Sequence, residues 1–220
     1  MNIPSRIPAM TLSDVVLFPQ AMLPLRIFED RYKQMLSDVL NQERIFAIVA
    51  KRFQTLSDDR LDEPPFEVAT AGLIRVSKKN DDGTSFVMLQ GLSRIRIRSI
   101  NDEGPYRMLQ VEPFETIIEN DTKQFRNKIY EALVQNKLLG GDTSKEILEF
   151  LETIEDDVAF VDLAAFTFCK NTIRKQAMLE VQRLHKRAEM LFDDLIKENL
   201  QLSLWKQSSL NQDSIDLDRN

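Results

Sequence analysis

The residues able to carry catalysis are few in this chain and lie far apart. There is one histidine, His185, and one cysteine, Cys169, among 220 residues. One of each is too few for a zinc site built from these residues, and no recognisable Cys–His motif is present. His185 lies among arginines and lysines on a predicted helix, which favours a solvated residue. Cys169 ends an apolar helix, which favours a place in the core.

Phosphate-binding loops and paired carboxylates give no stronger case for an enzyme. A nucleotide-binding loop needs the spacing Gly-x-x-x-x-Gly-Lys-Ser/Thr, and residues 140–145 (GGDTSK) do not have it. Acids cluster at residues 58–59, 155–157 and 193–194, but acid–base catalysis needs two carboxyl groups facing each other in a cleft. Residues 155–157 stand where a helix begins, so we assign them to capping. We therefore predict no enzyme activity, no catalytic residue, no metal and no cofactor.

Residues 94–98 (RIRIR) alternate arginine with isoleucine, which is typical of a strand with one face in the core. The other face carries Arg94, Arg96 and Arg98, and neighbouring strands are expected to add Arg75, Lys78 and Lys79. A positive sheet face of this kind could follow the phosphates of RNA. No aromatic residue alternates with the arginines to stack on bases, so a solvated strand face is the competing interpretation.

A proline-bracketed apolar stretch near the N-terminus is the best candidate for a binding surface. Pro19 and Pro24 fix φ and remove two backbone donors, so we predict a rigid loop between them rather than a central strand. Large apolar side chains lie in and beside this loop: Leu17, Phe18, Met22, Leu23 and Leu25. Either they close one end of a barrel, or some of them face outward and contact client polypeptides. Met22 would suit the second role because its side chain is adaptable.

Bulk composition limits the class of protein. The hydrophobic content of 43% is sufficient for a large core, and the net charge of −6 argues against nucleic-acid binding through the overall field. The N-terminus lacks the apolar run of a signal peptide. Nowhere do eighteen apolar residues follow one another, so we expect no membrane-spanning helix. With a single cysteine, no internal disulfide can form, which fits a reducing compartment. We expect a cytoplasmic location.

The hydrophobic pattern changes character near residues 115–121, where a period of two gives way to a helical period. We predict strands over residues 7–12, 45–52, 67–78, 84–92, 94–98 and 106–114, a helix over 29–41, and a loop over 54–65. The dipeptide Asp82-Gly83 predicts a tight hairpin turn, and Gly91 predicts a bulge. About six strands with one early helix indicate a small, partly closed barrel.

The second half predicts a helical bundle. Helices are expected from about residue 121 to 139, from 144 onward, over 157–168, and over a long final stretch with an apolar seam at alternating steps of four and three. Gly140 and Gly141 should end the first of them. The predicted organisation is a β-rich barrel subdomain over 1–117, a helical subdomain over 118–205, and a polar, mobile tail over 206–220.

Several of these segments together resemble the N-terminal, substrate-binding domain of Lon proteases. The stretch 17–36 (LFPQAMLPLRIFEDRYKQML) is similar to the opening motif of that family. Residues 71–76, 82–84 and 87–97 follow in the family's order, as do 176–180 and 186–188 near the C-terminus. The resemblance covers about residues 7–202 and implies an α+β fold: a PUA-like barrel with one or two helices, followed by a helical bundle with a long terminal helix. The family helix usually breaks after the element at 176–180, yet residues 180–187 contain no proline or glycine, so a continuous helix is the open alternative.

The resemblance implies a non-catalytic module that binds unfolded or flexible polypeptide or a partner protein. Full-length family members continue into an ATPase and a Ser-Lys peptidase, which suggests a stand-alone domain here and a separate protease or ATPase acting in trans. The alternative function is RNA binding through Arg94, Arg96 and Arg98, since other PUA-like proteins bind RNA. A third alternative, peptide hydrolysis by this chain alone, has little support.

Overall fold

The computed structural model describes residues 3–52, 65–119 and 122–217 and divides the chain into two compact units. The first unit comprises residues 1–116 and 170–182, and the second comprises residues 117–169 and 183–220. The loop predicted over 54–65 lies outside the described residues except for Pro65, which forms an isolated bridge with Lys51. The first unit is β-rich and the second is helical, so the predicted α+β class is confirmed.

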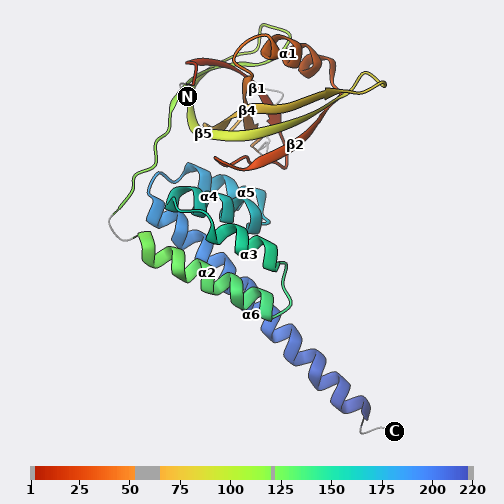
Figure 1. The fold of residues 1–220 in the computed structure, drawn as a ribbon, viewed down its shortest axis with the longest axis vertical. Helices are drawn as coiled ribbons and strands as arrows, with labels where there is room; N and C mark the ends of the chain where they lie inside the picture. Colours follow the sequence, from red (N-terminus) through yellow and green to blue (C-terminus); the bar gives the residue numbers. More distant parts are fainter. Residues whose placement is uncertain (1–2, 53–64, 120–121, 218–220) are drawn as a thin grey trace, which may run out of the picture. The chain divides into compact units, whose positions relative to one another are not determined.

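The first unit is built on one six-stranded sheet (Figure 1). Its strands are β1 (Arg6–Leu12), β2 (Met22–Ile27), β3 (Ile45–Ala50), β4 (Val68–Lys79), β5 (Ser85–Asn101) and β6 (Met108–Pro113). The order is β2-β5-β4-β3-β1-β6, and a further pairing of β5 with β6 closes five strands into a ring. All neighbouring strands are antiparallel except β1 and β3. The sheet is thus a partly closed barrel, as predicted.

Side chains that point into the ring form its core. The buried cluster draws on five strands: Ile7, Ala9, Ile45, Ala47, Val49, Ala69, Ala71, Leu73, Ile95, Leu109 and Val111. Several positions carry alanine, which leaves room for the branched side chains opposite. The alternation predicted at residues 94–98 contributes directly, since Ile95 is fully buried in this cluster.

Strand β2 corrects the prediction of a rigid loop between the prolines. The chain turns at Pro19 and Gln20, but it becomes a strand at Met22 and continues through Pro24 to Ile27. Among the described strands, β2 has β5 as its one neighbour, so it is an edge strand. An edge strand tolerates proline because one side of its backbone lacks ladder hydrogen bonds.

Strand β5 organises the unit because it pairs with three others. Its first half lies between β2 and β4, and its second half lies between β4 and β6. The segments predicted as two strands, 84–92 and 94–98, are therefore one strand with an irregularity at Leu92, directly after Gly91. The bulge expected near Gly91 is confirmed. Helix α1 (Asp30–Leu40) packs against the barrel near β1 (Figure 1) with an apolar stripe that includes Tyr32, Met35, Leu36 and Val39.

A second helix, α5 (Thr172–Glu180), also belongs to the barrel unit although it follows most of the bundle in the sequence. It contacts β4, and the amide of Gln176 donates to the carbonyl oxygen of Val68 at 2.9 Å. The helix ends at Val181, which has extended backbone angles, and the next helix starts at Leu184. The chain therefore breaks between the two helices, and the alternative of one continuous helix is wrong.

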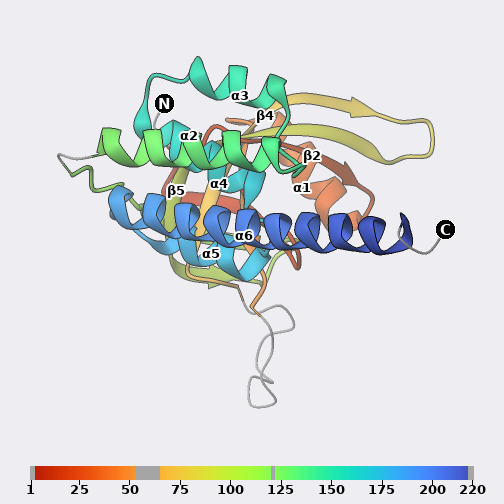
Figure 2. The same ribbon diagram turned by 90° about the horizontal axis from the view of Figure 1, so that it is seen from below.

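The second unit consists of α2 (Thr122–Leu138), α3 (Lys145–Glu152), α4 (Asp157–Phe168) and α6 (Leu184–Leu217). Helix α2 runs beside α6 (Figure 2), and α4 contacts both. Gly140, with φ of 85°, ends α2 as predicted. The side chain of Ser144 caps α3, and that of Asp156 caps α4 with Asp157 in its first turn, so capping is confirmed for these two of the acids at residues 155–157.

The first change of unit falls between Thr116 and Ile117, within one residue of the predicted boundary, but the rest of the division differs from the prediction. Residues 170–182 return to the barrel unit, and α6 continues as helix through Leu217 where a mobile tail was expected. The composition of residues 206–217 lacks an apolar stripe but contains no proline or glycine to end the helix. No helix within the described ranges is long and apolar enough to cross a membrane.

Candidate functional site

The loop before β2 is held tightly against the barrel. Leu17 and Phe18 are fully buried, and the hydroxyl of Thr70 donates to the carbonyl oxygen of Leu17. The loop also pairs with Gly91, whose amide donates to Ala21 and whose carbonyl accepts from Gln20. The structure therefore places Leu17 and Phe18 where the barrel-closing interpretation puts them, out of reach of a client chain.

The other three candidates divide according to the alternation of β2. Met22 points outward and is 43% exposed, while Leu23 and Leu25 are half-buried on the opposite, barrel-facing side. Pro24 is exposed on the same face as Met22. Of the five apolar side chains predicted from the sequence, Met22 is the one that is exposed to solvent.

Met22 belongs to a larger apolar surface that we call the hairpin-face patch: Met22, Pro24, Val76, Phe86 and Met88. These residues come from three adjacent strands, β2, β5 and β4. Pro24 pairs with Met88, which in turn pairs with Val76, so a row of apolar side chains crosses the three strands. Val76 is 49% exposed and Phe86 is 38% exposed. Large apolar groups gathered on one solvent-facing surface are a common mark of an interaction site.

Positive side chains border the hairpin-face patch. Phe86 pairs with Arg26 on one side and with Lys78 on the other. Arg26 also forms an ion pair with Asp82 at 2.9 Å, and Arg75 donates to the side chain of Gln90 at 2.7 Å. The surface thus combines an apolar centre with a rim in which positive charge predominates.

The arginines predicted to share one strand face are committed to different roles. Arg94 is 3% exposed, and its guanidinium donates to the carbonyl oxygens of Leu179 and Val181 and to the hydroxyl of Thr116. Arg96 is half-buried with its guanidinium 4.7 Å from the ring centre of Phe114. Arg98 is exposed and pairs with Glu112.

This arrangement does not form a phosphate-binding face. Arg94 faces protein carbonyls rather than solvent, and Arg98 already has a carboxylate partner. Removing Arg94 would break the attachment of α5 to the barrel, so its loss could not report on RNA binding. The fold explains the pattern of residues 94–98, because the buried Arg94 donates hydrogen bonds that hold α5 to the barrel.

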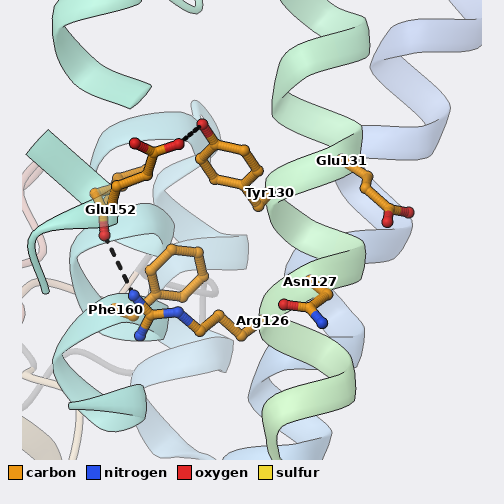
Figure 3. Close-up of a pocket in the computed structure, with 7 residues that line it drawn as sticks. Arg126, Asn127, Tyr130, Glu131, Glu152 and Phe160 are labelled. Carbon is orange, nitrogen blue, oxygen red and sulfur yellow. Dashed lines mark hydrogen bonds between the residues drawn. The ribbon is translucent and has the colours of Figure 1, made fainter. Parts of the chain in front are cut away.

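A hollow in the helical unit, of about 310 Å³, is lined by residues of α2, α3 and α4 (Figure 3). Tyr130 donates a hydrogen bond to Glu152, which is the main reason that the pKa of Tyr130 is raised. Arg126 lies 4.4 Å from the ring centre of Phe160, donates to carbonyls at the end of α3, and pairs with Asp157. Its side chain joins three helices, so we assign the hollow to packing rather than to chemistry.

Among the described residues there is no group of three His, Cys, Asp or Glu side chains that could bind a metal ion. Cys169 is a buried thiol, and His185 packs edge-on against Phe125 with 4.3 Å between ring centres. The acids at residues 58–59 lie outside the described part of the chain.

Residues 6–197 of the sequence match the family described as the ATP-dependent protease La (LON) substrate-binding domain. The chain belongs to this family. It is 27% identical to the Lon protease of Desulfosudis oleivorans over 96% of its own length, and 25% identical to that of Escherichia coli over 84%. It spans about a quarter of the length of these curated relatives, 26% and 24% respectively. The resemblance seen in the sequence is confirmed.

Solved structures of Lon N-terminal domains share the fold. The N-terminal domain of the Mycobacterium avium complex Lon protease aligns with a TM-score of 0.69 at 16% identity, covering 86% of this chain and 97% of that one. A Lon N-terminal domain protein from Xanthomonas campestris aligns with a TM-score of 0.52 at 19% identity over the same shares. These likenesses support the fold of a Lon substrate-binding domain.

Proposed function

We propose that this Lon substrate-binding domain is a non-catalytic module that binds unfolded or flexible polypeptide through the hairpin-face patch. The observation that carries the proposal is the row formed by Pro24, Met88 and Val76, with Met22 and Phe86 beside it, on a solvent-facing sheet surface. Two of these five side chains are methionines, which adapt to irregular apolar partners. Such a module serves proteolysis by holding a client for an ATPase or peptidase, in the same chain or in trans.

The edge of β2 favours side-chain contacts over the addition of a client strand. Gly91 donates to the carbonyl of Ala21, and hydrogen-bonded and non-bonded pairs alternate along an antiparallel ladder. The nitrogen of Pro24 therefore faces the free edge, where a client strand would need an N–H donor. Because Pro24 lacks this donor, a client is expected to lie across the face of the hairpin instead.

The hairpin-face patch also explains what kind of segment is bound. A folded protein rarely offers a flexible apolar segment, whereas an unfolded chain offers many. The rim cations Arg26, Arg75 and Lys78 would favour clients that carry acidic residues beside their apolar ones. Affinity for any single segment is expected to be modest, because a few half-exposed side chains supply the apolar contact and the client must be ordered on binding.

The test is titration of a fluorescently labelled, reduced and carboxymethylated protein that stays unfolded without denaturant, followed by fluorescence anisotropy. The double variant Met22→Ser/Phe86→Ser should bind about tenfold more weakly than wild type, which corresponds to about 1.4 kcal/mol. Phe150→Ser is the matched control, because Phe150 is 55% exposed but lies in the helical unit. Equal binding by the double variant and wild type would remove the proposal, as would an equal loss in the control.

A further inference from the structure

The opposite face of the same hairpin borders a groove that the polypeptide-binding surface does not use. Residues of α1, the α1–β3 connection and the β4–β5 hairpin line this open groove of about 490 Å³, a size common for small-ligand sites. Because side chains alternate along a strand, Ser77 and Ser85 point to this face while Val76 and Phe86 point to the other. The two surfaces are therefore distinct.

The lining of the groove is strongly biased toward positive charge. Its charged members are Lys33, Arg44 and Lys79, and no carboxylate is found among the described residues that line it. This local excess occurs in a chain whose net charge is −6. Lys33 also pairs with Asp30 at 3.0 Å, but the Asp30 side chain is 98% exposed, so water screens that pair.

Hydroxyl donors accompany the cations. The groove contains Ser37 from α1, Ser77 from β4 and Ser85 from β5. Lysine and arginine supply charge-assisted hydrogen bonds to oxyanions, and serine hydroxyls can donate to the remaining oxygens. Leu36 and Leu40 add an apolar wall on the side of α1. Three cations and three hydroxyls exceed what one carboxylate can use and suit the several oxygens of a phosphate group.

The backbone at Arg44 gives an independent reason to look for a role of its side chain. Arg44 has φ of 61°, a left-handed conformation that glycine or asparagine adopts at lower cost. Hydrogen bonds fix it there: its amide donates to Val39 at 3.2 Å, and its carbonyl accepts from Ile74 at 2.9 Å. An arginine at such a position adds nothing to the turn itself, but it brings a guanidinium to the groove.

We propose that this basic groove binds a small phosphate-bearing molecule. Arg44 contributes the bidentate donor, Lys33 and Lys79 contribute point charges, and the serines complete the oxyanion site. The leucine wall would contact the organic part of a phosphorylated compound. The ligand is thus a phosphorylated small molecule, and binding neither requires nor excludes a client on the hairpin-face patch.

The experiment is an NMR titration of the ¹⁵N-labelled protein with inorganic pyrophosphate at low ionic strength, repeated with adenosine monophosphate. Saturable shifts at the amides of Ser37, Ser77 and Ser85 are expected. Tighter binding of the nucleotide would identify an organic phosphate, and tighter binding of pyrophosphate would identify an inorganic one. Citrate provides a carboxylate of similar charge, and equal or tighter binding of citrate would overturn the assignment to phosphate.

Variants separate a built site from diffuse attraction. Arg44→Gly should weaken pyrophosphate binding about tenfold while leaving Tm unchanged or higher, because glycine relieves the left-handed backbone. Lys79→Gln should weaken binding without unfolding the protein, since this side chain is exposed. Arg98→Gln removes an exposed arginine outside the groove and should have no effect. The proposal fails if no saturable shift appears, or if Arg98→Gln weakens binding as much as Arg44→Gly does.

Discussion

Arg187 Nε lies 2.9 Å from Asp162 Oδ1, and both side chains are completely enclosed in the helical unit. Arg187 comes from α6 and Asp162 from α4, so the ion pair joins two helices that contact each other in the helical unit. Burial lowers the pKa of Arg187, and the charge of Asp162 opposes this shift. The pair sets how α4 and α6 meet, since neither charge is tolerable without the other.

Removal of one partner alone is predicted to be severe. Asp162→Ala should lower the free energy of unfolding by about 3–5 kcal/mol, because it leaves a buried guanidinium without its carboxylate. Replacement of both residues by apolar ones of similar volume, Asp162→Leu with Arg187→Met, should recover most of that loss. Urea unfolding followed by circular dichroism at 222 nm measures both effects.

The control for this prediction lies on the same helix. Lys186 and Glu189 form an exposed ion pair at 2.7 Å, and Glu189→Gln should cost less than about 1 kcal/mol. If Asp162→Ala lowered the free energy of unfolding no more than Glu189→Gln does, the buried ion pair would not stabilise the fold. If the double variant were as unstable as Asp162→Ala, the loss of stability could not be attributed to an unpaired buried charge.

Much of the fold could be predicted because local patterns and tertiary structure agree. The barrel strands follow a period of two, and the helix at 157–168 has the predicted bounds because Asp156 caps it and Cys169 leaves helical geometry. The break before Leu184 could not be predicted in this way. No residue between 180 and 184 disfavours helix strongly, and the break depends on Arg94, which binds the carbonyls of Leu179 and Val181 from a strand far away in sequence.

Arg94 is therefore predicted to attach α5 to the barrel. Arg94→Lys keeps the charge but cannot span three acceptors with a planar fork, so the free energy of unfolding should fall by about 3 kcal/mol. Hydrogen exchange at the amides of α5 should accelerate more than exchange in β3. Arg98→Lys is the control, because Arg98 is exposed on the same strand and should cost less than about 1 kcal/mol. Unchanged exchange in α5 would contradict the assignment.

The proposed binding surface was harder to predict than the fold. Met22 could be found from the proline-rich stretch, but Val76, Phe86 and Met88 were missed because they lie in two other predicted strands, far from Met22 in sequence. The register of β2, β5 and β4 brings them together. The one available signal was alternation within residues 84–92, which places Phe86 and Met88 on one face. Alternation alone does not say which face of the strand points into the barrel, because that depends on how the sheet curves.

Gly91 is predicted to be irreplaceable for a packing reason. A Cβ atom at this position would lie 2.0 Å from the carbonyl oxygen of Phe18, which is backbone and cannot rotate away. Gly91→Ala should therefore destabilise the protein by about 3 kcal/mol, at the upper end for an overpacked site. Gly104→Ala is the matched control, since its Cβ would be 3.6 Å from the carbonyl oxygen of Tyr106, an ordinary contact. Thermal unfolding of both variants tests this prediction. Similar Tm values for the two would contradict the close approach of the loop at Phe18 to β5.

The turn of the β4–β5 hairpin should respond to acid in a way that identifies its hydrogen bonds. The pKa of Asp82 is lowered from its ordinary value of 3.8 by the hydroxyl and the amide of Thr84, with a smaller contribution from Arg26. Because the folded state holds this proton less tightly than the unfolded state, the stabilisation is complete above pH 3.8 and is lost as the pH falls through the lower, folded value.

A ¹³C NMR titration of the Asp82 carboxyl group tests this directly. The pKa should lie below 3.8 in the wild type and rise toward that value in Thr84→Val, which removes the hydroxyl donor but keeps the backbone amide. Arg26→Gln should raise the pKa less, because the arginine acts from an exposed position where its charge is screened. A larger rise of the Asp82 pKa in Arg26→Gln than in Thr84→Val would contradict this prediction. The ion pair with Arg26, rather than the hydrogen bonds of the turn, would then be the main cause of the lowered pKa.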